Sequence, residues 1–429
     1  MALEVYKFGG ASVKDALAVK NVGEIIHSSG IENLLVVVSA TGKTTNALQQ
    51  VVKDYFGKEN DPFVTLNEIK KSHLEMCLSL FPDNKEALED VLDSFVEIEW
   101  MLEEDSDDSF DYFYDQVVSV GEIVSSKILE HFLKTLGLKS FWLDVRDVIL
   151  TDNTFREAKV DWKETEDRIS IKCKDLFEAN QIVVTQGFIG SSSENFTTTL
   201  GREGSDFSAA IFAYCLSAKA LTIWKDVPGV LTADPRLFEN ASKLDRLSYR
   251  EAIEMTYYGA KVIHPKTIKP VQNKSIALHV KSFVEPDKPG TLIDEHTTES
   301  YPPIVVFEHN QSLLRIATKD FSFVAEDHLS QIFDLIARFR VKVKMMKNTA
   351  VSFILSVDHD ETKVEALMTE LQQFFNVSLE TGLELLTIRH YNEDTIKSLT
   401  SSRVILFEER LPNTIQMVVK PIATLKLKD

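Results

Sequence analysis

The sequence has few cysteines, no long apolar run and a shortage of positive charge. Its 429 residues include only Cys77, Cys173 and Cys215, an odd number without the spacing of a zinc site, so we expect buried free thiols. The N-terminus, MALEVYKFGG, lacks the apolar core and cleavage site of a signal peptide. The longest plain apolar run, residues 34–38, is too short to span a bilayer. These absences predict a cytoplasmic protein without a membrane partner.

Positive charge is scarce: 47 Lys and Arg face 66 Asp and Glu, for a formal net charge of -19 at pH 7. A chain of this sign lacks the clustered cations that nucleic acid requires, so we expect no nucleic-acid partner. The ten histidines form no metal-ligand pattern, and GxGxxG is absent, which excludes a dinucleotide-binding fingerprint. We therefore expect neither a metal held by the protein's own side chains nor a dehydrogenase domain.

Short apolar segments alternate with amphipathic helical segments through the first two thirds of the chain. The predicted strands are 3–8, 34–40, 140–145, 181–188, 220–227 and 276–283. This alternation predicts an α/β fold in which helices sandwich a mostly parallel sheet. Ligands collect at the carboxyl ends of the strands in such sheets. Lys7, Ser39, Phe188 and Asp226 lie at or just after predicted strand ends.

A stretch rich in proline and charge, 285–303, precedes a change of pattern. The following strands and helices have the order βαββαβ, which is typical of a small ligand-sensing ACT domain with a ferredoxin-like fold. A second copy begins but stops before its second helix and last strand, and the strand 303–307 is expected to complete its sheet. The predicted domains are 1–295, a linker with an added strand at 296–311, a first ACT domain at 312–382, and a second, truncated ACT domain at 383–429.

An unpaired strand edge in the truncated repeat favours association with a second copy of the chain, so we expect a homodimer or higher homo-oligomer through this region. The acidic stretch 97–115 has two interpretations. It is either a solvated helix end and loop or a flap over a ligand site.

Two glycine-containing segments have the composition of an anion site. The segment 197–206, TTTLGREGSD, places Arg202, Ser205 and Asp206 on a glycine-bracketed loop before an apolar helical run. Glycines allow close backbone approach, and the N-terminal amides of a helix attract negative charge. Near the N-terminus, Lys7 is followed by Gly9 and Gly10. Each residue also has a purely structural interpretation. Lys7 could be an exposed lysine at the end of a strand, and Asp206 could be an ordinary acidic residue in the first turn of a helix.

The segment SATGKTT, 39–45, resembles the end of a Walker A loop. The pattern GxxxxGK[ST] requires a glycine where Val37 stands, so this interpretation fails.

Five motifs together closely resemble the aspartate kinases of the amino-acid kinase family, over essentially the whole chain. They are 7–12 (KFGGAS), 36–40 (VVVSA), 119–122 (SVGE), 197–206 and 257–265 (YYGAKVIHP). The resemblance implies a monofunctional enzyme that transfers the γ-phosphoryl group of ATP, with Mg²⁺, to the side-chain carboxylate of L-aspartate. The product is 4-phospho-L-aspartate, and the reaction is the first step toward lysine, threonine and methionine.

The resemblance also implies residue roles. Lys7 contacts the transferring phosphoryl group and is held by Asp206. Glu122, which could otherwise be a routine helix glutamate, binds the α-ammonium of aspartate, and Arg202 binds its α-carboxylate through paired hydrogen bonds. The other implied substrate positions are Ser39, Thr45, Phe188 and Ser205. The implied nucleotide positions are Lys7, Gly9, Gly10, Lys225, Asp226, Arg236 and Lys261.

Two other functions stay open: a kinase for another amino acid such as glutamate, and a catalytically silent amino-acid sensor. The chain departs from the family at Ala11, Lys225 and Leu231, where threonine, threonine and tyrosine are usual. Lys342, Lys344 and Lys347 cluster where lysine-inhibited relatives receive the effector's ammonium groups. Because like charges repel, we expect lysine to be a poor inhibitor.

Overall fold

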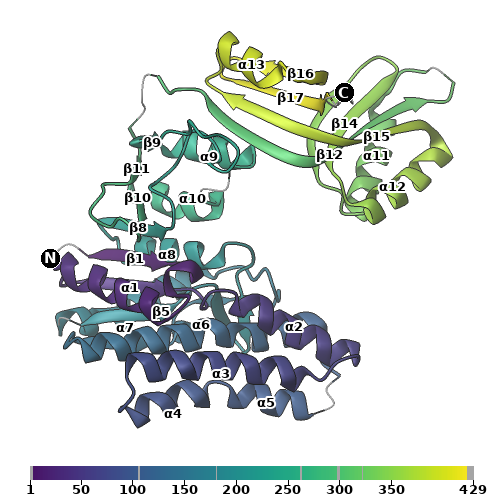
Figure 1. The fold of residues 1–429 in the computed structure, drawn as a ribbon. Coiled ribbons are helices and arrows are strands. Elements are labelled where there is room, and N and C mark those ends of the chain that lie inside the picture. The colour runs from purple at the N-terminus through teal and green to yellow at the C-terminus, as the bar shows by residue number, and fades with distance from the viewer. Residues whose placement is uncertain are drawn as a thin grey trace, which may run out of the picture. The chain divides into compact units, whose positions relative to one another are not determined.

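The computed structural model describes residues 3–104, 107–179, 181–260, 263–296, 300–320 and 322–422. The chain divides into two compact units (Figure 1). The first consists of Met1–Val230, Lys243–Thr256 and Lys261–Thr298, and the second of Leu231–Ser242, Tyr257–Ala260 and Glu299–Asp429. Two short segments from within the first two thirds of the sequence therefore belong to the second unit.

The first unit contains an eight-stranded sheet with the order β3-β5-β2-β1-β8-β10-β11-β9. Its strands are β1 (Glu4–Phe8), β2 (Leu34–Val38), β3 (Ser140–Leu143), β5 (Ile182–Gln186), β8 (Ala220–Lys225), β9 (Arg246–Ser248), β10 (Ala277–Ser282) and β11 (Thr291–Asp294). All neighbours pair in parallel except β10 and β11. The predicted α/β fold with a mostly parallel sheet is confirmed. Every residue of β2 is buried, as expected for a strand covered on both faces.

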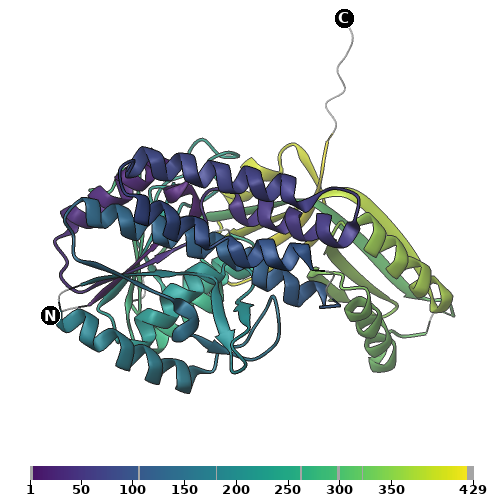
Figure 2. The same ribbon diagram turned by 90° about the horizontal axis from the view of Figure 1, so that it is seen from below.

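Helices cover both faces of this sheet, with α1, α2, α3 and α6 on one side and α7 and α8 on the other (Figures 1 and 2). The helices of the unit are α1 (Ala16–Ser29), α2 (Thr44–Gly57), α3 (Pro62–Leu80), α4 (Lys85–Asp93), α5 (Val96–Glu103), α6 (Phe110–Thr135), α7 (Trp162–Glu178), α8 (Gly204–Cys215), α9 (Tyr249–Tyr257) and α10 (Pro265–Asn273). Tyr6 and Phe8 enter a hydrophobic core with residues of α1, α2, α3 and α6. Because side chains alternate along a strand, Lys7 points to the opposite face, toward α8.

The described part of the acidic stretch 97–115 is helical at both ends, in α5 and the first turns of α6. The Ser109 side chain caps α6 by accepting a hydrogen bond from the Tyr112 amide. A small three-stranded sheet, β4-β6-β7, completes the unit; its strands are β4 (Leu150–Thr151), β6 (Ile189–Ser192) and β7 (Thr197–Thr199). β7 leads directly into the loop before α8.

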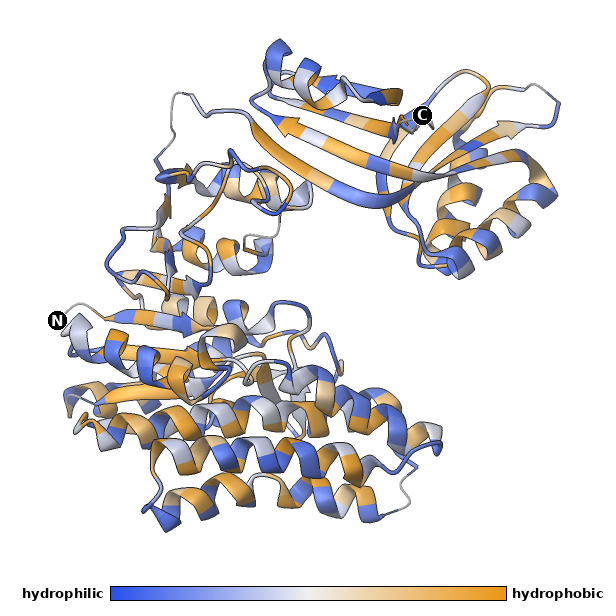
Figure 3. Cartoon of the chain, viewed as in Figure 1, coloured by the Kyte–Doolittle hydropathy of each residue, from blue (hydrophilic) through white to orange (hydrophobic). Residues whose placement is uncertain are grey.

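The second unit has one six-stranded antiparallel sheet with the order β13-β14-β12-β15-β17-β16. Its elements are β12 (Ile304–Thr318), α11 (Glu326–Arg338), β13 (Val343–Asn348), β14 (Ser352–Asp358), α12 (Glu361–Phe374), β15 (Phe375–Arg389), α13 (Glu393–Thr400), β16 (Arg403–Leu411) and β17 (Thr414–Pro421). The long strands β12 and β15 pair along both halves of the sheet, with register shifts between Glu308 and Leu313. The two ACT-like repeats therefore share one sheet, and its strands contain many hydrophobic residues (Figure 3).

The domain boundaries expected at 311–312 and 382–383 fall inside the continuous strands β12 and β15. Lys344 of β13, one of the three clustered lysines, is neutralised by acidic residues of the chain itself. Its Nζ lies 2.5 Å from Oε1 of Glu308 and 3.5 Å from Oδ1 of Asp358. Among the described residues, no helix combines the length and the apolar character needed to cross a membrane.

Candidate active site

Gly10, the second glycine after β1, allows the loop after β2 to pack directly against its backbone. A Cβ atom on Gly10 would lie 2.7 Å from the carbonyl oxygen of Ala40 and 2.9 Å from that of Gly42. The Gly42 amide donates a 3.0 Å hydrogen bond to the Gly10 carbonyl, and the Ser39 amide donates one to the Phe8 carbonyl, also at 3.0 Å. Only glycine fits at position 10, so the motif has a steric reason as well as an electrostatic one.

Two lysines meet one buried carboxylate at the carboxyl ends of β1 and β8. Nζ of Lys7 lies 2.7 Å from Oδ1 of Asp206, and Nζ of Lys225 lies 3.5 Å from Oδ2. Burial opposes ionisation of Asp206, but the charges and hydrogen bonds of Lys7 and Lys225 outweigh it and lower the pKa of this carboxyl group. Two cations around one anion leave a net positive charge, which suits a phosphate-bearing ligand.

Glu122 lies on α6, beside the loop that follows β2, and is only 3% exposed. It accepts a hydrogen bond from the Ala40 amide, and burial raises its pKa to about 8 against the opposing effects of backbone hydrogen bonds and the positive charge of Lys7. Its Oε2 atom is buried without a hydrogen-bond partner among the described residues. Gly121 permits this close packing, because a Cβ atom there would lie 3.0 Å from Cβ of Ala40. A buried carboxylate with an unused oxygen is suited to receive an ammonium group.

The loop between β7 and α8 is fixed by tight packing. Phe188 has a left-handed backbone (φ 70°), and its amide donates a 2.9 Å hydrogen bond to Oγ of Ser208. A Cβ atom on Gly187 would lie 2.5 Å from Cβ of Ser205, and one on Gly204 would lie 2.7 Å from Cδ2 of Phe188. Strained backbone and compulsory glycines of this kind are common at ligand sites.

Arg202 lies in the turn before α8 and is exposed. Its guanidinium group forms no ion pair with any residue in the described ranges, which leaves it available to a carboxylate. Ser205 and Asp206 lie in the first turn of α8 and are buried. The structure thus brings the residues of the 197–206 loop to the same unit as Lys7 and Glu122.

The remaining predicted positions are less closely grouped. Thr45 lies in the first turn of α2 and is half-buried, and Asp226 is exposed just after β8. Arg236 belongs to the second unit, where it pairs with Asp234 at 2.6 Å, so its nucleotide role remains a prediction. Lys261 lies outside the described residues.

Sequence reasoning missed residues that position the site. Oγ of Ser125 donates a 2.7 Å hydrogen bond to the Ser39 carbonyl and fixes the loop after β2. Gly121 and Gly187 were not singled out either, although a glycine next to a proposed ligand residue, in SVGE and TQGF, is a signal that was available.

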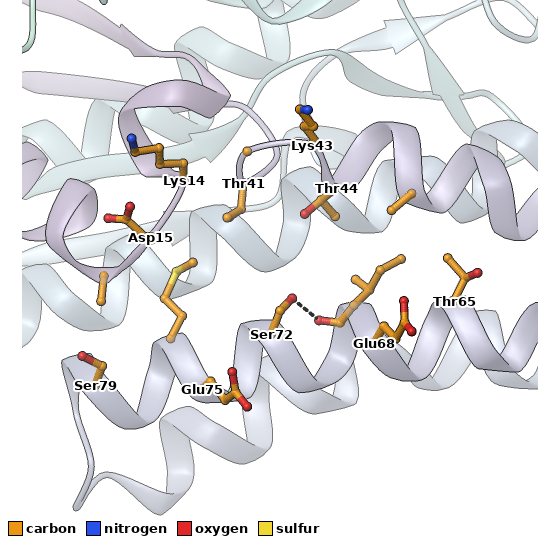
Figure 4. A pocket seen from close by; sticks show the side chains of 15 residues that line it. Lys14, Asp15, Thr41, Lys43, Thr44, Thr65, Glu68, Ser72, Glu75 and Ser79 are labelled. Atoms are coloured by element: carbon orange, nitrogen blue, oxygen red, sulfur yellow. Dashed lines mark hydrogen bonds between the residues drawn. The ribbon is translucent and has the colours of Figure 1, made fainter.

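A groove with a volume of about 500 Å³ is lined on one side by the 41–44 loop (Figure 4). Lys14, Asp15 and Lys43 line one wall, and Glu68 and Glu75 of α3 line the facing wall. None of the residues predicted to bind the substrates lines this groove.

Comparison with known proteins agrees with this geometry. Residues 2–282 match the model of the amino acid kinase family. The lysine-sensitive aspartokinase 3 of Escherichia coli K12 is 31% identical over 396 residues, which cover 90% of this chain and 86% of that protein. A chloroplastic bifunctional aspartokinase/homoserine dehydrogenase 2 of Arabidopsis thaliana is 31% identical over 392 residues, but the chain covers only 42% of its length.

Crystal structures of E. coli aspartokinase III show the same fold. The complex with aspartate and ADP (R-state) has a TM-score of 0.80 at 28% identity and covers 97% of this chain and 96% of that one. The complex with lysine and aspartate (T-state) also has a TM-score of 0.80 at 28% identity, with 98% and 96% covered. The chain belongs to the amino acid kinase family and, within it, to the aspartokinases.

Proposed function

We propose that this protein is an aspartate kinase, which transfers the γ-phosphoryl group of ATP to the side-chain carboxylate of L-aspartate and releases ADP and 4-phospho-L-aspartate. This reaction is the first step of lysine, threonine and methionine biosynthesis. The observation that carries the proposal is the combination of a buried Glu122 oxygen without a partner and an Arg202 without an ion pair among the described residues. Aspartokinase relatives, one of them crystallised with aspartate and ADP, support it.

On the substrate side, Glu122 receives the α-ammonium of aspartate, and Arg202 donates two parallel hydrogen bonds to its α-carboxylate. Ser39, Thr45, Phe188 and Ser205 are assigned to the walls of the same subsite. An ammonium group next to Glu122 stabilises the ionised carboxylate, so substrate binding and loss of the Glu122 proton are coupled.

On the phosphate side, transfer brings an anionic phosphoryl group to an anionic carboxylate, so cations and amide donors must line the path. Lys7 and Lys225 supply the cations, Gly9 and Gly10 allow the backbone to approach, and Asp206 holds both lysines in place. No general base is needed, because the side chain of aspartate, with a pKa near 3.9, is already ionised at neutral pH. Asp226, Arg236 and Lys261 are assigned to the nucleotide.

The chain's own residues fit a Mg²⁺ ion that arrives on the nucleotide. The described residues contain no group of three or more His, Cys, Asp or Glu side chains able to hold a metal, and Asp206 is already engaged by two lysines. Bound through phosphate oxygens, Mg²⁺ would neutralise charge on the phosphates. We further propose that the enzyme is cytoplasmic and forms a homodimer through its second unit.

The deciding experiment measures ADP release by the purified protein with ATP, Mg²⁺ and either aspartate or glutamate. Hydroxylamine in a parallel reaction traps an acyl phosphate as the hydroxamate. Aspartate-dependent ADP and hydroxamate, both lost in Lys7→Met, are the expected result. Turnover with glutamate but not with aspartate would indicate a glutamate kinase. Aspartate binding by calorimetry without turnover indicates a silent sensor.

A further inference from the structure

Two adjacent side chains of α6 hold the strand that leads to Arg202. Asp115 is fully buried, and its Oδ2 accepts hydrogen bonds from the amides of Thr199 (2.8 Å) and Arg156 (2.9 Å). Its Oδ1 accepts a third, from the Thr199 hydroxyl, at 2.7 Å. The Gln116 side chain donates to the Thr197 carbonyl (2.8 Å) and accepts from the Thr197 amide (3.2 Å), as a neighbouring strand would.

These contacts reach the substrate loop by a short path. Thr199 is the last residue of β7, and only Leu200 and Gly201 separate it from Arg202. A Cβ atom on Gly201 (φ 77°) would lie 3.1 Å from the Arg156 carbonyl oxygen. The Asp115 carboxylate therefore joins α6, β7 and the turn at Arg156 at a single point beneath the loop.

The same helix carries Glu122. Glu122 follows Asp115 by seven positions, which is about two helical turns, so the two side chains lie on nearly the same face about 10 Å apart along the axis. A helix of 26 residues whose middle is buried is a rigid spacer over this distance. α6 thus carries Glu122, one of the two proposed substrate contacts, and is connected to the other, Arg202, through Asp115 and Gln116.

We propose that Asp115 and Gln116 form a clamp that sets the position of Arg202 relative to Glu122 and so determines affinity for the α-amino acid. Asp115 is a positioning residue, since it contacts no substrate itself. This inference rests on the proposed function, because it takes Glu122 and Arg202 as the two ends of the amino-acid subsite. Burial raises the pKa of Asp115 to about 6, against the three hydrogen bonds and the nearby Arg156 charge, so the carboxylate is mostly ionised and able to accept all three bonds above neutral pH.

The test compares Asp115→Asn with Asp111→Asn. An asparagine side chain has one acceptor oxygen and cannot satisfy donors on both sides. We expect the KM for aspartate to rise about tenfold or more, with kcat within about threefold and the KM for ATP unchanged, as for lost binding contacts. Asp111 lies one turn earlier on α6 and pairs at the surface with the Arg156 guanidinium at 3.0 Å, so Asp111→Asn should leave all three constants unchanged.

A milder pair of variants covers the case in which Asp115→Asn does not fold. Thr199→Val removes only the hydroxyl donor to Asp115 and should raise the KM for aspartate about threefold to tenfold, whereas Thr199→Ser keeps the hydroxyl and should restore the wild-type value. Equal increases in the KM for aspartate and for ATP, or no difference between Val and Ser at position 199, would overturn the clamp.

A double-mutant cycle with Arg202→Lys tests the route. If Asp115 acts through Arg202, the double variant should bind aspartate about as weakly as Arg202→Lys alone. A Kd for aspartate that rises by the product of the two single-variant increases would show that Asp115 does not act through Arg202. Calorimetric Kd values for aspartate separate this outcome from failure of the proposed function. Wild-type protein that binds aspartate without turnover disproves the kinase but still tests the clamp, and wild-type protein that does not bind aspartate disproves both.

Discussion

Lys7 and Asp206 form a buried ion pair in which each residue keeps the other in position. We expect Lys7→Ala and Asp206→Ala each to lower kcat by about two orders of magnitude or more, because the charge that stabilises the transferring phosphoryl group is lost or displaced. Lys14→Ala, which removes an exposed lysine outside this pair, is the matched control. Steady-state kinetics with circular dichroism checks activity and fold. Turnover near wild type in either variant would remove the pair from the phosphoryl path.

The raised pKa of Glu122 gives the activity a definite pH dependence. In the free enzyme this carboxyl group has a pKa of about 8 and is mostly protonated at pH 7, whereas an ammonium ligand requires the carboxylate. We therefore expect kcat/KM for aspartate to increase from about pH 7 to above pH 8, following one deprotonation in the free enzyme. A profile for aspartate that is flat from pH 6.5 to 8.5 would contradict this assignment.

The same group affects stability with the opposite trend. The folded state holds the Glu122 proton more tightly than the unfolded chain, whose carboxyl group has the ordinary pKa of 4.5. The unfolded state therefore binds fewer protons between about pH 4.5 and pH 8, and the contribution of this residue to the free energy of unfolding falls as pH rises through that window. Chemical denaturation at pH 6 and pH 8 measures this effect. The free energy of unfolding should fall less between these two pH values in Glu122→Gln than in the wild type.

At the scale of elements, the contact between the end of β5 and the start of α8 requires Gly187. A Cβ atom there would lie 2.5 Å from Cβ and 2.7 Å from Cα of Ser205, so Gly187→Ala forces the end of β5 or the start of α8 to shift. We expect about tenfold lower kcat/KM and a stability loss of about 1–3 kcal/mol. Gly57→Ala, at the end of α2 with no atom within 4 Å of its Cβ position, should be neutral or slightly stabilising. Similar effects of both variants in thermal melts and kinetics would show that the close contact is unimportant.

The sequence predicted those elements whose hydrophobic pattern is continuous. The strand expected at 3–8 is β1 (Glu4–Phe8), and the one expected at 276–283 is β10 (Ala277–Ser282), because apolar residues recur in both segments at the short spacing and over the length typical of strands. β7 was not predicted, since its three threonines have no apolar signal and are held by Asp115 and Gln116, more than eighty positions away in the chain. Likewise, the motifs pointed to Lys7 and Arg202, but nothing local indicates that Lys225 reaches Asp206.

At the scale of the whole molecule, the six-stranded sheet of the second unit contacts two segments that follow β8 and α9 in the sequence and belong to the same unit. The Val305 amide of β12 donates a 2.7 Å hydrogen bond to the Thr232 carbonyl, and the rings of Phe307 and Phe238 meet edge to face at 6.5 Å. Glu308, one residue further along β12, packs against Gly259. β12 therefore contacts the segment 231–242, which carries Arg236, through a main-chain hydrogen bond and an aromatic pair.

Glu308 also bears on the response to lysine, because it is the partner of Lys344. Because Lys344 pairs with Glu308 and Asp358, both carboxylates of this cluster are already occupied by a cation of the chain itself. Lys342 and Lys347 are exposed and form no ion pair within the described residues. A lysine ligand would face these cations without a free carboxylate from this cluster, so we expect free lysine to inhibit the wild type only weakly, at millimolar concentration or above.

Removing the internal cation should reverse this behaviour. Lys344→Ala leaves Glu308 and Asp358 without their lysine, and a buried or half-buried carboxylate without a counter-charge favours binding of an external cation. We expect Lys344→Ala to be inhibited by lysine at concentrations about tenfold lower than wild type, whereas Lys342→Ala, which removes an exposed charge without freeing a carboxylate, should change sensitivity by about threefold or less. Titration of kinase activity with lysine measures both. Submillimolar inhibition of the wild type, or equal sensitivity of the two variants, would show that the Lys344 cluster does not control access of a cationic effector, because in that case the charge of Lys344 would have no influence on the bound ligand.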